Sequence, residues 1–227
     1  MKTVKSRTWV KMAVAAAATG LAVSACSTTQ LGAAAITGNS RITASELTGQ
    51  VANLNSAYAK DKSKGIKPQR ATGQETQQVL TWLILFKVYD KLADQHGISV
   101  TPAQAQKQIA ALSSEAKSNK VTLDEYVSAG GAVPPDLLPQ LGRYFSILSQ
   151  LESRLNGGKV PTTPSSKLES TVGRYQCLAS KDLSVRVNPQ YGVWDYRSDS
   201  VVLTPPTLAA NPSPAASATP AVTRPPC

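Results

Sequence analysis

A helix-capping signature occurs four times between residues 43 and 125, each time directly before an apolar run. In this signature a Thr hydroxyl accepts a hydrogen bond from the backbone N–H three residues later, and the Glu or Gln at that later position accepts one from the Thr backbone N–H. Because all four precede apolar residues at helical spacing, we expect a mainly α-helical domain. The pairs are Thr43 and Glu46, Thr72 and Glu75, Thr101 and Gln104, and Thr122 and Glu125.

The apolar runs after these signatures, and one later run, predict five helices. The second is the longest and most apolar, so we expect it at the centre of the core. Its apolar stripe includes Trp82, Phe86 and Tyr89, which recur at helical spacing. The predicted helices cover about residues 44–60, 73–96, 102–117, 123–129 and 134–155.

Short strand signals stand on either side of the helical block. Residues 34–37 favour a strand before the first helix, and residues 183–187 alternate as a half-buried strand does. Residues 158–168 have the composition of a Pro/Thr/Ser linker. Residues 201–227 are rich in Pro, Ala, Ser and Thr, and we expect them to form a disordered tail because they offer few large apolar groups to bury. The folded domain is therefore expected over residues 34–200.

The first 25 residues have the layout of a secretory signal peptide. Four basic residues precede an uncharged, Ala-rich run over 12–23, and small residues then lead to Cys26. Residues 23–26 resemble a bacterial lipobox, whose cysteine is lipidated and becomes the first residue of the mature protein. The alternative is an ordinary cleaved signal peptide with an incidental cysteine. We expect a leader over 1–25, a spacer over 26–33, and a lipid anchor on Cys26 that holds the protein at the outer face of the cell membrane.

Charge and composition argue against several classes of function. The chain has a net charge of +10, and the leader carries four of the positive charges, which leaves +6 without it. No dense Lys/Arg run remains, so a solvated basic surface is favoured over nucleic-acid binding. The single histidine, His96, has no partner at metal-ligand spacing, and no glycine-rich loop precedes a helix. We expect no enzyme activity, no metal and no cofactor, and a hydrolase is the weakest interpretation.

Two cysteines remain if Cys26 is lipidated. They are Cys177, near the end of the domain, and Cys227, at the last position. An exported location permits disulfides. Our hypothesis is that Cys177 and Cys227 pair, which would tie the C-terminal tail back to the domain.

Four segments resemble, in order, the N-terminal domain of the SurA/PrsA-type periplasmic and cell-surface chaperones. The first looks like the opening strand, glycine turn and helix start of that family, and the second like the start of a later helix. The third looks like a helix pair, and the fourth like the closing strand, with Gln190 where Arg is usual. The resemblance spans about residues 34–196. The segments are residues 34–43, 97–102, 122–137 and 187–192.

The resemblance implies a SurA N-terminal-like helical domain that is closed by a small sheet. In that family the first and last strands meet beside the helices. Relatives often carry a parvulin prolyl-isomerase domain between the helices and the closing strand. Here only residues 156–182 occupy that interval, too few for such a domain, so the resemblance argues against isomerase activity.

The resemblance also implies a chaperone that binds extended, apolar segments of unfolded secreted or envelope proteins weakly and without ATP. We hypothesise that five aromatic residues line an open cradle for these segments, although ordinary core packing is the alternative for most of them. The second interpretation of function is a structural or adaptor lipoprotein that docks one specific envelope partner. The five residues are Trp82, Phe86, Tyr89, Tyr144 and Phe145.

Overall fold

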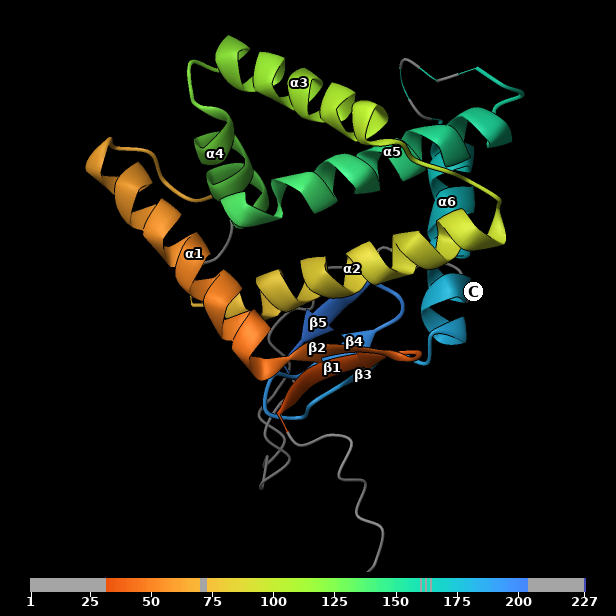
Figure 1. Cartoon of the computed structure of the whole chain (residues 1–227), viewed down its shortest axis with the longest axis horizontal. Coiled ribbons are helices and arrows are strands. Elements are labelled where there is room, and N and C mark those ends of the chain that lie inside the picture. Colours follow the sequence, from red (N-terminus) through yellow and green to blue (C-terminus); the bar gives the residue numbers. More distant parts are fainter. Residues whose placement is uncertain (1–31, 70–72, 160, 162, 164, 204–226) are drawn as a thin grey trace, which may run out of the picture.

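The computed structural model describes residues 32–69, 73–159, 161, 163, 165–203 and 227 (Figure 1). The predicted leader over 1–25, Cys26 and the rest of the predicted spacer up to residue 31 lie outside the described residues. The same holds for residues 204–226, which make up most of the predicted disordered tail.

Helices dominate the described part of the chain, as the capping signatures predicted. Thr101 and Thr122 form complete capping boxes with Gln104 and Glu125, and Thr43 accepts a hydrogen bond from the backbone N–H of Glu46 at 3.0 Å. The helices are α1 (Ala44–Ser63), α2 (Glu75–Gln95), α3 (Pro102–Ser118), the short α4 (Leu123–Glu125), α5 (Leu138–Leu155) and α6 (Ser166–Asp182).

The first and last parts of the domain meet in a three-stranded antiparallel sheet, as predicted. Its central strand is β1 (Ala33–Thr37), which pairs with β2 (Ser40–Thr43) on one side and β3 (Arg186–Val187) on the other. Ala35 lies opposite both Ile42 and Val187. The sheet therefore closes the domain by joining segments about 150 residues apart.

A second, two-stranded sheet was not predicted. It consists of β4 (Val193–Asp195) and β5 (Ser200–Val202), which pair as an antiparallel hairpin. Trp194 and Val201 point inward and are buried. The backbone N–H of Val201 donates to the hydroxyl of Thr81 at 2.9 Å, which fixes the hairpin against α2.

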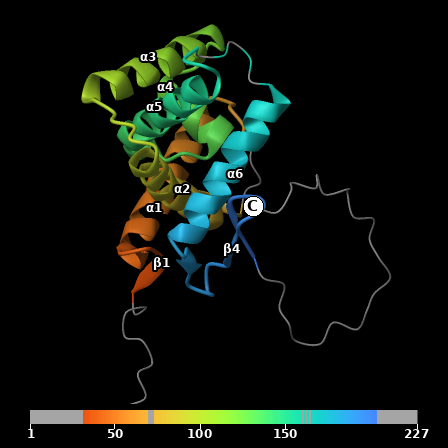
Figure 2. The same cartoon turned by 90° about the vertical axis from the view of Figure 1, so that its right-hand side faces the viewer.

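Helix α2 lies at the centre of the molecule, as its apolar composition predicted. In Figure 1 it runs between the sheets on one side and α5 on the other, and α3 covers α5 from outside. Figure 2 shows α6 crossing the end of this arrangement, where it packs against α2 and α5. The residues of α2 that are completely buried form the middle of the core; they are Val79, Leu80, Ile84, Val88 and Leu92.

Three of the predicted segment boundaries were wrong. Helix α2 begins at Glu75, and the side chain of Gln74 before it makes no capping hydrogen bond. The carboxylate of Glu75 accepts a hydrogen bond from the backbone N–H of Gly73. Thr72, the predicted cap, lies outside the described residues. The predicted helix over 123–129 is α-helical only to Glu125 and continues as a π-helical turn, η2 (Tyr126–Gly130). A 3₁₀ turn, η3 (Pro135–Leu137), precedes α5.

The predicted linker over 158–168 was also wrong at its end, because α6 begins at Ser166. The hydroxyl of Ser165 accepts a hydrogen bond from the backbone N–H of Leu168 at 3.2 Å and so caps the helix. Leu168, Val172 and Ala179 are buried on one face of α6. The polar composition of the preceding segment obscured this helical spacing.

Candidate functional site

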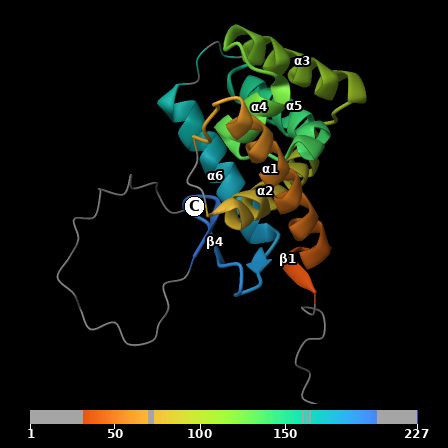
Figure 3. The ribbon, with the colours of Figure 1, turned by 90° about the vertical axis from the view of Figure 1, so that its left-hand side faces the viewer.

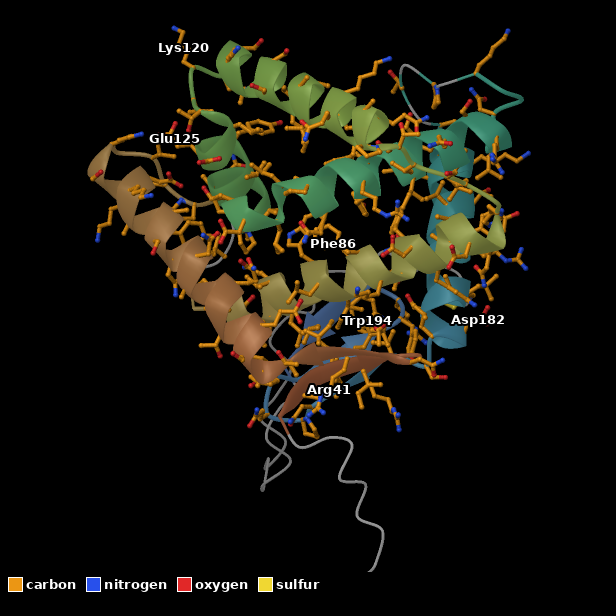
Figure 4. The ribbon with its side chains drawn as sticks, viewed as in Figure 1. Arg41, Phe86, Lys120, Glu125, Asp182 and Trp194 are labelled. Carbon is orange, nitrogen blue, oxygen red and sulfur yellow. A yellow bond between two sulfur atoms is a disulfide. The ribbon has the colours of Figure 1, made fainter. Side chains whose placement is uncertain are left out.

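The five aromatic residues predicted to line a cradle lie together between α2 and α5. Trp82, Phe86 and Tyr89 project from one face of α2 because they are three and four residues apart. Tyr144 and Phe145 project from α5, which runs alongside. Figure 4 shows Phe86 in the space between the two helices. We call these five residues the aromatic cluster.

Tyr144 is the centre of the aromatic cluster, with a ring contact to each of the other four residues. Its ring centroid lies 4.3 Å from that of Tyr89 and 5.1 Å from that of Phe145. The centroids of Trp82 and Phe86 are 5.7 and 6.3 Å away, both in edge-to-face arrangements. The pairs of Tyr144 with Trp82, Phe86 and Phe145 have the edge-to-face geometry that aromatic rings prefer, and the pair with Tyr89 is shorter and tilted, so the cluster joins α2 to α5 as one packed unit.

The members of the cluster differ in their exposure to solvent. Tyr89 and Phe86 are buried, with 2% and 8% of their surface exposed. Trp82, Tyr144 and Phe145 are only partly buried, although they pack against the core. Phe86 and Tyr89 are therefore core residues, whereas Trp82, Tyr144 and Phe145 each keep part of their surface exposed.

Two hydrogen bonds fix the indole N–H of Trp82 and the hydroxyl of Tyr89. The indole N–H of Trp82 donates to the carbonyl oxygen of Gly131 at 2.9 Å. The hydroxyl of Tyr89 donates to Oε1 of Gln176 on α6 at 3.1 Å. Burial raises the pKa of Tyr89 and that of Tyr144, so both phenols stay neutral near neutral pH. The cluster is therefore uncharged and mostly apolar.

The structure joins Cys177 to Cys227 through a disulfide, with 5.9 Å between the two Cα atoms. Cys177 lies on α6 and is buried. The last residue of the chain is thus attached to the helix that also holds Gln176, the partner of Tyr89. Cys26, the predicted lipidation site, lies outside the described residues.

His96 has a structural setting at the C-terminal end of α2. Its ring packs edge-on against Tyr175, with 4.8 Å between the centroids, and its backbone oxygen accepts a hydrogen bond from Arg154. Within the described ranges, no group of three or more His, Cys, Asp and Glu side chains is placed to hold a metal ion. None of the helices in that part of the chain has the length and apolar character needed to cross a membrane.

One protein family matches the chain. The model for the SurA-like N-terminal domain matches residues 1–131, more than half of the sequence. The chain belongs to the SurA-like N-terminal domain family. Membership indicates a chaperone-type protein with a role in protein folding. Among the curated proteins and solved structures that were compared with it, none matches.

The family match covers only part of the SurA-like domain that the structure describes. It includes β1, β2 and helices α1 to α4, and it ends before α5, α6 and the closing strand β3. Trp82, Phe86 and Tyr89 lie inside the match, whereas Tyr144 and Phe145 lie beyond it. The aromatic cluster is thus built from matched and unmatched parts of the chain.

Sequence reasoning missed two residues that position the cluster. Gln176 was missed because α6 was not predicted, although Ser165 and the spacing of Leu168 and Val172 give a usable helix signal. Gly131 was missed for a different reason. Its role is played by a backbone carbonyl, and no side-chain pattern reports where a carbonyl oxygen points.

Proposed function

We propose that this protein is a membrane-tethered lipoprotein that works outside the cytoplasm, where it holds unfolded segments of secreted or envelope proteins without ATP and without isomerase activity. The observation that supports this most is the aromatic cluster. Its partly exposed rings are fixed in place by the packing of Phe86 and Tyr89 beneath them.

The properties of this surface suit weak binding of apolar segments. Rings held in place lose little conformational freedom when a client segment packs on them, so binding needs no rearrangement. Leu85 and Leu148 are also partly buried and pack against the same core, and they extend the apolar character of α2 and α5. An apolar surface bounded by polar side chains is the usual physical means of such binding.

The interval between α5 and β3 supports a role without an isomerase domain. Residues 166–182 of this interval form α6, which packs against α2 and α5. Its side chain Gln176 holds Tyr89 of the aromatic cluster. The segment that would have to hold an isomerase domain is thus part of the helical domain itself.

The position of β1 supports a tether. Strand β1 begins at Ala33 at one end of the molecule, with α3 at the opposite end (Figure 3). A lipid on Cys26 would therefore hold the sheet end towards the membrane and leave the helices α3 and α5 facing away from it. Detection of covalently bound lipid on the purified full-length protein, with Cys26→Ser as the control, tests this part of the proposal.

The chaperone activity is tested with residues 27–227 as a soluble protein. The measurement is light scattering of an unrelated, chemically unfolded client, with the protein at substoichiometric to equimolar ratios. We expect dose-dependent suppression of aggregation without ATP. We also expect Trp82→Ala and Phe145→Ala to weaken suppression, because both remove a partly exposed ring. The matched control is Tyr175→Ala, which removes a partly exposed ring from α6.

Two results would change the proposal. If the folded protein, checked by circular dichroism, fails to suppress aggregation, the chaperone role is wrong and the adaptor interpretation replaces it. Crosslinking in cells would then be expected to give one folded envelope partner rather than many. If suppression occurs but Trp82→Ala and Phe145→Ala leave it unchanged, the clients bind elsewhere on the domain.

A further inference from the structure

A second surface feature lies at the end of the molecule opposite the sheet. It is an open pocket of about 580 Å³ where the C-terminal ends of α1 and α3 meet the start of α4. Figure 4 shows Lys120 and Glu125 at this end and Arg41 at the other. We call it the lysine pocket. It is lined by Lys64, Ile66, Lys117, Lys120, Val121, Thr122 and Glu125.

Both oxygens of Glu125, the one carboxylate that lines the lysine pocket, accept hydrogen bonds from neighbouring residues. One oxygen of Glu125 accepts a hydrogen bond from Nζ of Lys64 at 2.5 Å, and the other accepts from the backbone N–H of Thr122 at 2.7 Å. The Lys64 ammonium and the Thr122 N–H hold the pKa of Glu125 at about 2, well below its ordinary value of 4.5. Glu125 therefore stays charged and neutralises Lys64.

Two cations of the pocket are left without a counter-charge. Lys64 pairs with Glu125, and neither Lys117 nor Lys120 takes part in an ion pair with another described residue. Both lysines are exposed and lie three residues apart at the end of α3. The pocket therefore presents a local positive charge to solvent.

The lysine pocket also has an apolar side. Ile66 and Val121 line it and are partly buried, so part of their surface remains accessible. A ligand that uses the whole pocket carries negative charge next to an apolar group. A polypeptide segment with Asp or Glu beside an aliphatic residue has this chemistry, whereas a phosphate polymer would leave Ile66 and Val121 uncovered.

We propose that the lysine pocket binds acidic segments of unfolded client chains, with client carboxylates at Lys117 and Lys120 and a neighbouring aliphatic side chain against Ile66 and Val121. This inference rests on the proposed chaperone function and adds a client class to it. The net charge of +6 that remains without the four positive charges of the leader favours the approach of acidic chains in the same way. Clients would thus be held at two surfaces, by apolar contact at the aromatic cluster and by charge at the lysine pocket.

The backbone conformation at Lys120 allows a substitution that removes the lysine charge and keeps the fold. Lys120 follows the end of α3 with φ of 59°, in the left-handed region, and the next residue, Val121, donates its backbone N–H to Ala116 at 3.1 Å. Glycine is the residue that this helix-ending position favours. Lys120→Gly should therefore keep or raise the thermal midpoint while it removes one of the two free cations.

The test measures binding of fluorescent peptides by anisotropy to residues 27–227. The probes are an unstructured Asp/Leu peptide, a Lys/Leu peptide of the same length and pattern, and inorganic polyphosphate as a competitor. We expect the acidic peptide to bind at least about tenfold more tightly than the basic one at low salt, and this preference to shrink as salt screens the charges. Lys120→Gly, and more strongly Lys117→Glu with Lys120→Glu, should remove most of the preference. Lys107→Glu, an exposed lysine elsewhere on α3, is the matched control and should have little effect.

The outcomes separate this inference from the proposed function. If the lysine variants bind the acidic peptide with the same affinity as the unaltered protein, and a neutral client is still protected from aggregation, the inference is wrong and the chaperone role stands. If polyphosphate binds at the pocket more tightly than the acidic peptide and Lys120→Gly abolishes that binding, the ligand is a phosphate polymer and the inference is overturned. If no peptide binds and no client is protected, both proposals fail.

Discussion

The indole N–H of Trp82 donates to the carbonyl oxygen of Gly131 across 2.9 Å, which joins the middle of α2 to the turn after η2. The same indole ring makes a T-shaped contact with the ring of Tyr144 from α5, with 5.7 Å between the centroids and 86° between the ring planes. One side chain thus links three segments, α2, α5 and the turn. Its orientation is set by a polar contact, and the residue remains partly exposed.

We predict that Trp82→Phe separates the structural part of this side chain from the part that contacts clients. Phenylalanine keeps an aromatic ring but has no N–H, so the carbonyl of Gly131 loses its partner. The free energy of unfolding should fall by about 1–2 kcal/mol, while suppression of aggregation is largely kept. Urea unfolding followed by circular dichroism measures the first effect. Equal stability of Trp82→Phe and the unaltered protein would show that the hydrogen bond contributes nothing.

Helices α3 and α5 approach each other closely at Gly142. A Cβ atom at this position would lie 2.7 Å from the carbonyl oxygen of Ala105 and 2.8 Å from Cγ1 of Ile109. Because a backbone oxygen cannot move aside without shifting α3, we predict that Gly142→Ala lowers the free energy of unfolding by about 1–3 kcal/mol.

Gly173 is the matched control for Gly142→Ala. It also lies within a helix, α6, and a Cβ atom there would meet no other atom within 4 Å. Gly173→Ala should therefore stabilise the protein by up to about 1 kcal/mol, because alanine loses less conformational freedom in a helix. Chemical unfolding of the two variants side by side gives the comparison. A loss of stability in both would show that the close approach at Gly142 is not the cause.

The bridge between Cys177 and Cys227 gives a prediction about both covalent state and stability. Mass spectrometry of the non-reduced protein should find the two cysteine peptides linked, and two free thiols would contradict the pairing. Removing the bridge with Cys227→Ser should lower the free energy of unfolding by about 2–4 kcal/mol, because residues 50 apart in sequence are no longer tied in the unfolded chain. Cys227→Ser leaves the buried Cys177 unchanged, so this variant separates loss of the bridge from a change in the core.

The fold was predictable where the sequence pattern is local and repeated. Capping boxes and helical spacing act within one turn, so Thr101 with Gln104 and Thr122 with Glu125 indicated true helix starts. The meeting of the first and last strands came from the family resemblance, since no local pattern pairs Ala35 with Val187. The hairpin of β4 and β5 was missed because its strands are three residues long, too short to show a clear alternation.

The aromatic cluster was predictable as a set of residues but not in its detail. Spacing along α2 places Trp82, Phe86 and Tyr89 on one face, and it cannot say which of them lie beneath the surface. That depends on how Tyr144 packs from α5, which is a contact between segments far apart in sequence. The lysine pocket was not predicted at all, because its residues come from three segments whose ends meet only in the folded chain.

The ion pair between Lys64 and Glu125 predicts a pH dependence of stability. Its hydrogen bonds lower the pKa of Glu125 from its ordinary value of 4.5 to about 2 in the folded protein. Between these two values the unfolded chain binds a proton at Glu125 that the folded protein does not. The stabilisation from Glu125 is therefore complete above pH 4.5 and is lost as the pH falls towards 2.

Glu125→Gln tests this dependence, because glutamine keeps the shape of the side chain and cannot titrate. The free energy of unfolding, measured by urea denaturation in steps from pH 6 down to about pH 2, should fall less steeply for Glu125→Gln than for the unaltered protein. Asp124→Asn is the matched control, since Asp124 is the exposed neighbour of Glu125 in the same helix. It should leave the slope in this range close to that of the unaltered protein. If Glu125→Gln and the unaltered protein lose stability in parallel, other carboxylates dominate the acid response and the pair with Lys64 contributes little to it.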